Sequence, residues 1–101
     1  TMNQTPEGYS LESNYPNPFN PSTKISFTIP EARHVSLVVY DALGREVATL
    51  VDSELGAGTH TVSFDGQKLA SGVYIYRIRA GDASTSSAQN FVQEKKMQLV
   101  K

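Results

Sequence analysis

Apolar and polar residues alternate along most of this chain, and the alternation predicts β-strands. Ile25, Phe27 and Ile29 are separated by small polar residues, a period of two that is typical of a strand with one buried face. No stretch of ten or more residues has helical periodicity, so an all-β fold is expected. The same period of two recurs at residues 35–40, 59–64, 73–80 and 91–101.

Turn-forming residues punctuate the strands about every ten positions. The sequence DALG at residues 41–44 predicts a tight hairpin, because Asp can bond the backbone of the turn and Gly accepts a positive φ. A strand from Arg45 to about Val51 is expected to follow, with a bulge where its apolar residues lie three positions apart. Loops are expected at DSELGAGTH, DGQKLASG and GDASTSSAQN.

Six or seven short strands of this kind favour an immunoglobulin-like antiparallel β-sandwich, with a small barrel as the alternative. Residues 9–13 are expected to add a short edge strand. The chain has neither cysteine nor tryptophan, so the likeness to immunoglobulin domains concerns architecture only. Residues 15–101 are expected to form the sandwich, and residues 1–14 to form the tail of a linker with that edge strand.

Composition narrows the range of functions. A chain of 101 residues is of ordinary size for one domain, and a net charge of −1 offers no basic field for nucleic acid. No apolar run approaches the roughly 20 residues that a membrane-spanning helix needs, so membrane insertion is not expected. The absence of cysteine removes disulfides, thiol catalysis and thiolate metal sites.

Catalytic chemistry is not visible in the sequence, and no enzyme activity or cofactor is expected. His34 and His60 do not form a metal-binding pair, and neither a nucleophile motif nor a phosphate-binding loop is present. Asp41, Asp52, Asp65 and Asp82 all fall in expected turns, where turn chemistry explains them. A calcium site built from these loop carboxylates is the alternative.

The five tyrosines raise the question of a sugar-stacking platform. Tyr74 and Tyr76 share a strand face with Ile78, which favours core packing. Tyr40 lies opposite the apolar face of its strand and is the best candidate for an exposed aromatic ring. A β-sandwich accessory module that binds carbohydrate for a secreted hydrolase is therefore the alternative function.

The stretch NYPNPFNPST holds three of the five prolines. Each proline fixes its own φ and biases the preceding residue toward extended structure, so a semi-rigid, polyproline-like strap is expected. Tyr15 and Phe19 are expected to pin this strap to the sandwich. The segment would then mark the boundary between an upstream region and the folded unit.

These pieces also form an ordered set. NYPNPFNPST is followed by I-x-F-x-I-P, V-x-L-x-x-Y-D-x-x-G-R-x-V-x-x-L, G-x-H, L-x-S-G-x-Y-x-Y-R and a final KKMQLVK. The set resembles the type A C-terminal sorting domains of the type IX (Por) secretion system. The resemblance implies an immunoglobulin-like sandwich fused to an upstream cargo and directing it from the periplasm across the outer membrane. It also implies that translocon components and a sortase-like peptidase are partners, and that the exported cargo is located at the cell surface or outside the cell.

The resemblance assigns roles to three groups of residues. The proline stretch corresponds to a boundary motif, the S-G-x-Y-x-Y stretch to a supporting motif, and the chain end to the sorting signal. The loop at residues 82–90 is longer than in the shorter members of the family. The assigned residues are Tyr15, Pro16, Asn17, Pro18, Phe19, Asn20 and Pro21 for the boundary; Ser71, Gly72, Tyr74 and Tyr76 for the support; and Lys96, Met97, Gln98, Leu99, Val100 and Lys101 for the signal.

A terminal strand has a physical means of acting as a signal. At a sheet edge it offers backbone groups and alternating side chains to a partner, as in recognition by strand addition. The alternative is that Lys95, Lys96 and Lys101 only solvate an edge and prevent unwanted pairing. Processing by the peptidase is expected before Tyr15.

Overall fold

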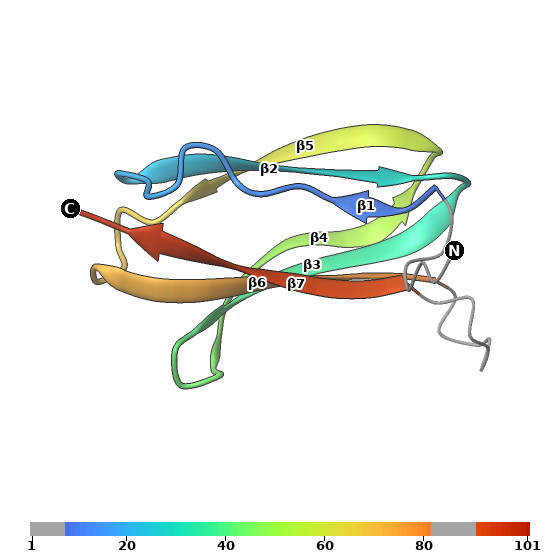
Figure 1. Cartoon of the computed structure of the whole chain (residues 1–101). Coiled ribbons are helices and arrows are strands. Elements are labelled where there is room, and N and C mark those ends of the chain that lie inside the picture. The colour runs from blue at the N-terminus through green and yellow to red at the C-terminus, as the bar shows by residue number, and fades with distance from the viewer. Residues whose placement is uncertain (1–7, 82–90) are drawn as a thin grey trace, which may run out of the picture.

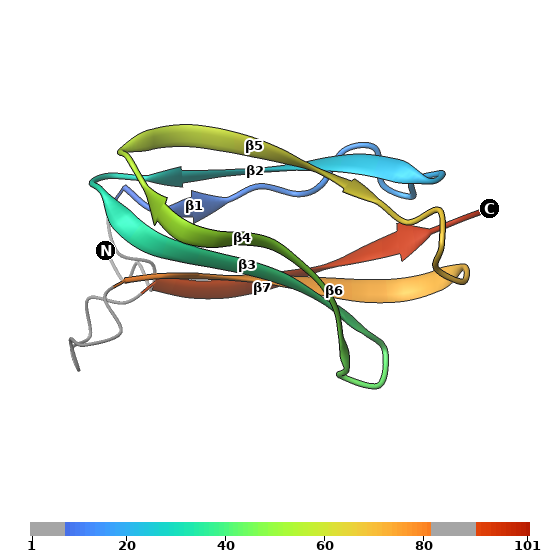
Figure 2. The ribbon, with the colours of Figure 1, turned by 180° about the vertical axis from the view of Figure 1, so that it is seen from behind.

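Two antiparallel sheets face each other in the computed structural model, which describes residues 8–81 and 91–101 (Figures 1 and 2). One sheet has three strands in the order β1-β2-β5, and the other has four in the order β4-β3-β6-β7. The expected all-β sandwich is confirmed. The strands are β1 (Ser10–Leu11), β2 (Ser22–Ile29), β3 (Arg33–Asp41), β4 (Glu46–Leu55), β5 (Gly58–Asp65), β6 (Gly72–Ala80) and β7 (Phe91–Leu99).

The core lies between the sheets and is built by the alternation seen in the sequence. In β2, the side chains of Ile25, Phe27 and Ile29 are at most 1% exposed, while their polar neighbours face solvent. The same holds for the apolar face of each long strand of the other sheet except the edge strand β4, whose apolar side chains are only partly buried. Burial of this kind stabilises the fold by about 25 cal/mol for each Å² of apolar surface. The buried residues from that sheet are Val35, Leu37, Val39, Tyr74, Tyr76, Ile78, Ala80, Phe91, Met97 and Leu99.

The hairpin between β3 and β4 confirms the expected turn chemistry. The Asp41 carboxylate accepts hydrogen bonds from the backbone N–H groups of Leu43 and Arg45, both at 2.9 Å, and Gly44 has a φ of +86°. These bonds, above all the one from the Arg45 backbone, lower the pKa of Asp41. Two register shifts along β3 and β4 confirm the expected bulge.

The expected loop at residues 52–60 is mostly strand. β4 continues to Leu55 and β5 begins at Gly58, so the connection between them is only two residues long. Asp52 therefore lies in a strand and not in a turn, where it contacts His34 at 2.9 Å. The polar sequence misleads because β4 is the edge strand of its sheet, and an edge strand tolerates hydrophilic side chains. Asp82 and the loop at 82–90 lie outside the described residues.

The N-terminal part of the described chain packs into the sandwich. The expected edge strand is confirmed as β1, which pairs with β2. Tyr9 stacks on Phe91 with ring centroids 5.0 Å apart, and Leu11 and Asn14 are also buried. Packing into the sandwich thus includes Tyr9, Leu11 and Asn14, which precede the residue 15 expected as its start. In the described ranges, no helix is long and apolar enough to cross a bilayer.

Candidate recognition site at one end of the sandwich

Three stretches that are far apart in the sequence meet at one end of the sandwich. The proline stretch, the connection before β6 and the chain end lie together there in both views (Figures 1 and 2). The antiparallel register of β6 and β7 places Gly72 opposite Leu99. A parallel bridge joins Leu99 to Phe19. The residues assigned by resemblance to a boundary, a support and a signal are therefore neighbours in space.

The proline stretch is a closed loop, and the expected polyproline-like strap is wrong. Tyr15 and Lys24 exchange two backbone hydrogen bonds of 3.0 Å, so the chain turns back on itself within the stretch. Inside the loop, the Thr23 hydroxyl donates to the Pro16 carbonyl at 3.0 Å, and the buried Asn14 amide donates to Thr23 Oγ1 at 3.0 Å. Prolines restrict their own φ but leave their carbonyls free to accept bonds, and those tertiary bonds decide the path.

The two aromatic residues of this loop, Tyr15 and Phe19, differ in burial. Phe19 is 1% exposed and packs edge-on against Phe64 with ring centroids 6.0 Å apart, so its expected pinning role is confirmed. Tyr15 is 81% exposed, so the pinning role expected for it is wrong. Gly66 lies under Phe19, and its N–H donates to the Pro21 carbonyl at 2.8 Å.

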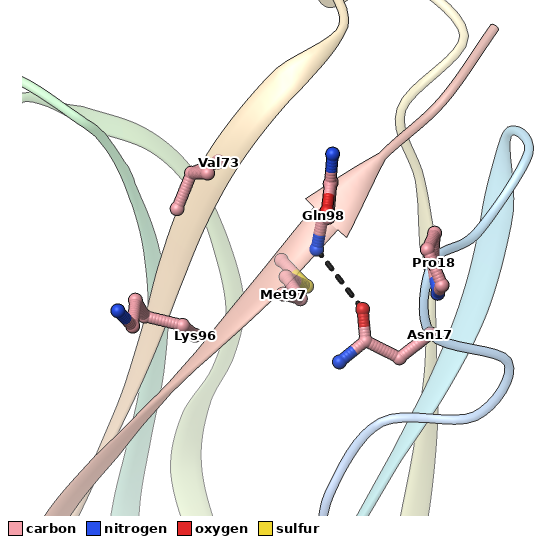
Figure 3. A pocket seen from close by; sticks show the side chains of 6 residues that line it. All are labelled: Asn17, Pro18, Val73, Lys96, Met97 and Gln98. Atoms are coloured by element: carbon pink, nitrogen blue, oxygen red, sulfur yellow. Dashed lines mark hydrogen bonds between the residues drawn. The ribbon is translucent and has the colours of Figure 1, made fainter.

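The loop also pairs with the end of the terminal strand. The Phe19 N–H donates to the Gln98 carbonyl, and the Val100 N–H donates to the Phe19 carbonyl, both at 2.9 Å. The Gln98 N–H donates to Asn17 Oδ1 at 3.0 Å (Figure 3). These three bonds hold residues 98–100 in place. The resemblance placed Asn17 in the boundary motif, but no sequence signal predicted its bond to Gln98 or the position of Gly66 beside Phe19.

The supporting motif and the residues just before it bond Lys101 and the start of β6. The Ser71 hydroxyl accepts the Lys101 N–H at 3.1 Å, and the Lys101 ammonium contacts the Gln67 carbonyl. The Tyr74 hydroxyl donates to the Ala70 carbonyl at 2.6 Å. Gly72 has a φ of +154°, a backbone conformation that favours glycine.

Tyr76 connects the N-terminal segment to the four-stranded sheet. Its buried hydroxyl donates to the Glu12 carbonyl at 2.8 Å and accepts the Asn14 N–H at 2.9 Å. Burial, as the main cause, raises the pKa of Tyr76 because it disfavours the phenolate. The strand pattern predicts Tyr76 as a core residue, and the resemblance places it in the supporting motif. In the structure it is also a polar anchor for residues 12–14.

A shallow groove of about 330 Å³ runs between the proline loop and the terminal strand (Figure 3). Lys96 is the only formally charged residue of its lining, and the exposed Val73 is one of its apolar residues. None of its six lining residues is an aspartate, a glutamate or a histidine. The lining residues are Asn17, Pro18, Val73, Lys96, Met97 and Gln98.

The geometry does not favour the two alternative sites, a sugar-stacking platform at Tyr40 and a calcium site of loop carboxylates. The Tyr40 ring face is covered by the Arg77 guanidinium, which lies 5.0 Å from the ring centroid and also bonds Glu94 at 3.0 Å. The Asp41 and Asp65 carboxylates accept backbone N–H groups of their own turns. Among residues 8–81 and 91–101, three or more metal-ligating side chains do not cluster anywhere.

The fold and this site define a class of protein: an immunoglobulin-like β-sandwich that presents its C-terminal segment, held by an N-terminal loop, at one exposed end. The family model described as "Secretion system C-terminal sorting domain" matches residues 13–93, and the chain belongs to this family, the C-terminal sorting domains of type IX secretion. The matched span includes the proline loop and the supporting motif and ends before Lys96.

A solved structure shares the architecture. The crystal structure of CopC from Methylosinus trichosporium OB3b superposes with a TM-score of 0.52 over 90% of this chain and 92% of that chain. Identity between the two sequences is 15%, so the likeness concerns the fold alone. Among proteins with curated descriptions, no sequence matches this chain.

Proposed function

We propose that this sorting domain presents residues 96–101 as the signal that type IX translocon components read on a folded, periplasmic cargo. Family membership supports the sorting role and export to the cell surface or beyond. The observation that carries the finer proposal is the set of bonds by which Asn17, Phe19 and Ser71 hold residues 98–101. Residues 98–101, held by three residues from two segments, have a defined shape that a partner can recognise at low entropic cost.

Export of a fused reporter tests this proposal. The reporter carries residues 1–101 at its C-terminus in a bacterium with a type IX system, and the exported and periplasmic fractions are measured. Removing residues 97–101 should leave the reporter in the periplasm. A matched control replaces the exposed Thr59, Thr61 and Ser63 of β5 with alanine and should be exported normally. Normal export of the truncated reporter would contradict the proposal.

We further propose that a sortase-like peptidase separates the cargo from the domain upstream of Tyr9. A cut before Tyr15 was expected from the sequence, and packing narrows it. Tyr9 and Leu11 are buried, and Glu12 and Asn14 bond the Tyr76 hydroxyl, so a cut among residues 9–14 would detach part of the core. Mass spectrometry of the released domain should find Tyr9 on it; a released domain that begins at Tyr15 would refute this refinement.

A further inference from the structure

Residues 8–81 and 91–101 pair with only part of the outer edge of β7. β7 ends the strand order of its sheet, so one side of its backbone faces away from β6. Asn17 and Phe19 occupy this side at Gln98 and Val100. Along the rest of the strand, no backbone hydrogen bond reaches this side from any residue in the described ranges. With respect to the described residues, the edge therefore divides into a closed end at residues 98–100 and an open stretch at residues 91–97.

The open stretch presents a defined set of backbone groups. In an antiparallel sheet, both backbone groups of one residue point to the same side, and the side alternates along the strand. Gln98 points its N–H and its carbonyl outward, to Asn17 and Phe19. Because Lys96 and Glu94 lie two and four positions earlier in a regular register with β6, their N–H and carbonyl groups also point outward. Each of the two residues thus offers one donor and one acceptor to an added strand.

The charged side chains of the open stretch favour a partner strand of opposite charge. Lys95 and Lys96 lie in the open stretch, and Lys96 is exposed beside the groove. The carboxylate of Glu94 is engaged by the Arg77 guanidinium at 3.0 Å, so it does little to offset the two ammonium groups. Acidic side chains on a partner would be favoured here, and a basic strand would be repelled.

We propose that the open edge of β7 at Glu94 and Lys96 binds an extended acidic segment of an export component by strand addition, and that Asn17 and Phe19 set the register by closing the edge at Gln98. This inference rests on the proposed function and names the chemistry of the partner. Strand addition derives its affinity from main-chain bonds and its specificity from side-chain sites. The proline loop already pairs with this edge, which shows that its backbone geometry accepts a neighbour.

Two substitutions of Lys96 test the backbone hydrogen bond and the side-chain charge separately. Lys96→Pro removes an N–H that points outward, so no bond to β6 is lost, and proline is tolerated on an edge strand in that orientation. Lys96→Glu keeps the N–H and reverses the charge. In the reporter assay, we expect each variant to reduce the exported fraction about tenfold or more, a change that corresponds to about 1.4 kcal/mol. Arg79→Glu, the same change in charge at an exposed residue of β6 that does not lie on the sheet edge, should be exported like the parent.

Parallel measurements keep the outcomes distinct. Circular dichroism and thermal unfolding of the isolated domain show whether each variant folds; if Lys96→Pro does not, Lys96→Glu and Lys95→Glu decide the matter. Normal export of the truncated reporter overturns the proposed function itself. Loss of export on truncation together with normal export of the folded Lys96 variants overturns strand addition alone, and the edge lysines then serve only solubility.

Discussion

Phe19→Ala tests whether the proline loop is a structural part of the end of the sandwich that holds residues 98–101. Phe19 is 1% exposed, so the substitution removes a whole buried ring. Large-to-small changes of this kind cost about 3–5 kcal/mol, and the value depends on how far the surroundings can fill the space. One neighbour is Gly66, which has no side chain to move into the cavity, and Phe64 is held by its own strand. We therefore expect a loss of about 4 kcal/mol in the free energy of unfolding.

Urea and thermal unfolding of residues 1–101 measure this loss. A domain of this size has a total stability of about 5–15 kcal/mol, so the variant should melt about 15 °C lower or more. Tyr15→Ala in the same loop is the matched control, because Tyr15 is 81% exposed. It should change stability by no more than about 0.5 kcal/mol. A cost below about 1 kcal/mol for Phe19→Ala, or equal costs for the two variants, would refute the packing argument.

Three further predictions concern single contacts. Gly66→Ala places a Cβ 3.0 Å from Leu99 Cδ2, so we expect overpacking to cost about 1–3 kcal/mol in urea unfolding, and no change would contradict the close approach. Tyr76→Phe leaves the buried Asn14 N–H without its acceptor and should lower the free energy of unfolding by about 1–3 kcal/mol, measured in urea. Because the folded pKa of Tyr76 is above its ordinary value of 10.0, this tyrosine ionises first in the unfolded state, so the parent should lose stability above pH 10. The variant lacks this contribution. Asp41→Asn should lower Tm at neutral pH, because the amide replaces the carboxylate that bonds the turn. The folded pKa of Asp41 is below the ordinary 3.8, so the difference in Tm between parent and variant should shrink as the pH falls below 3.8. A difference in Tm that does not change with pH would contradict this role of the carboxylate.

The fold class followed from local features of the sequence. Alternation in β2, β3, β6 and β7 is decisive because successive side chains of a strand point to opposite faces, so the buried face can be read directly. The hairpin at Asp41 was equally legible, since its turn depends on residues only a few positions apart. The three motifs of the site were also visible as patterns.

Only the tertiary structure shows how these motifs lie relative to one another. The pairing of Phe19 with Gln98 and Val100, the bond of Ser71 to Lys101 and the packing of Tyr9 on Phe91 join residues 30 to 82 positions apart in the chain. No local preference encodes such contacts, and in the proline loop they override the extended path that the prolines favour. The sequence by itself determined the strands, the turns and the buried faces, because these depend on neighbouring residues. The closed and open parts of the β7 edge depend on which distant segment reaches it, and only the folded chain determines that.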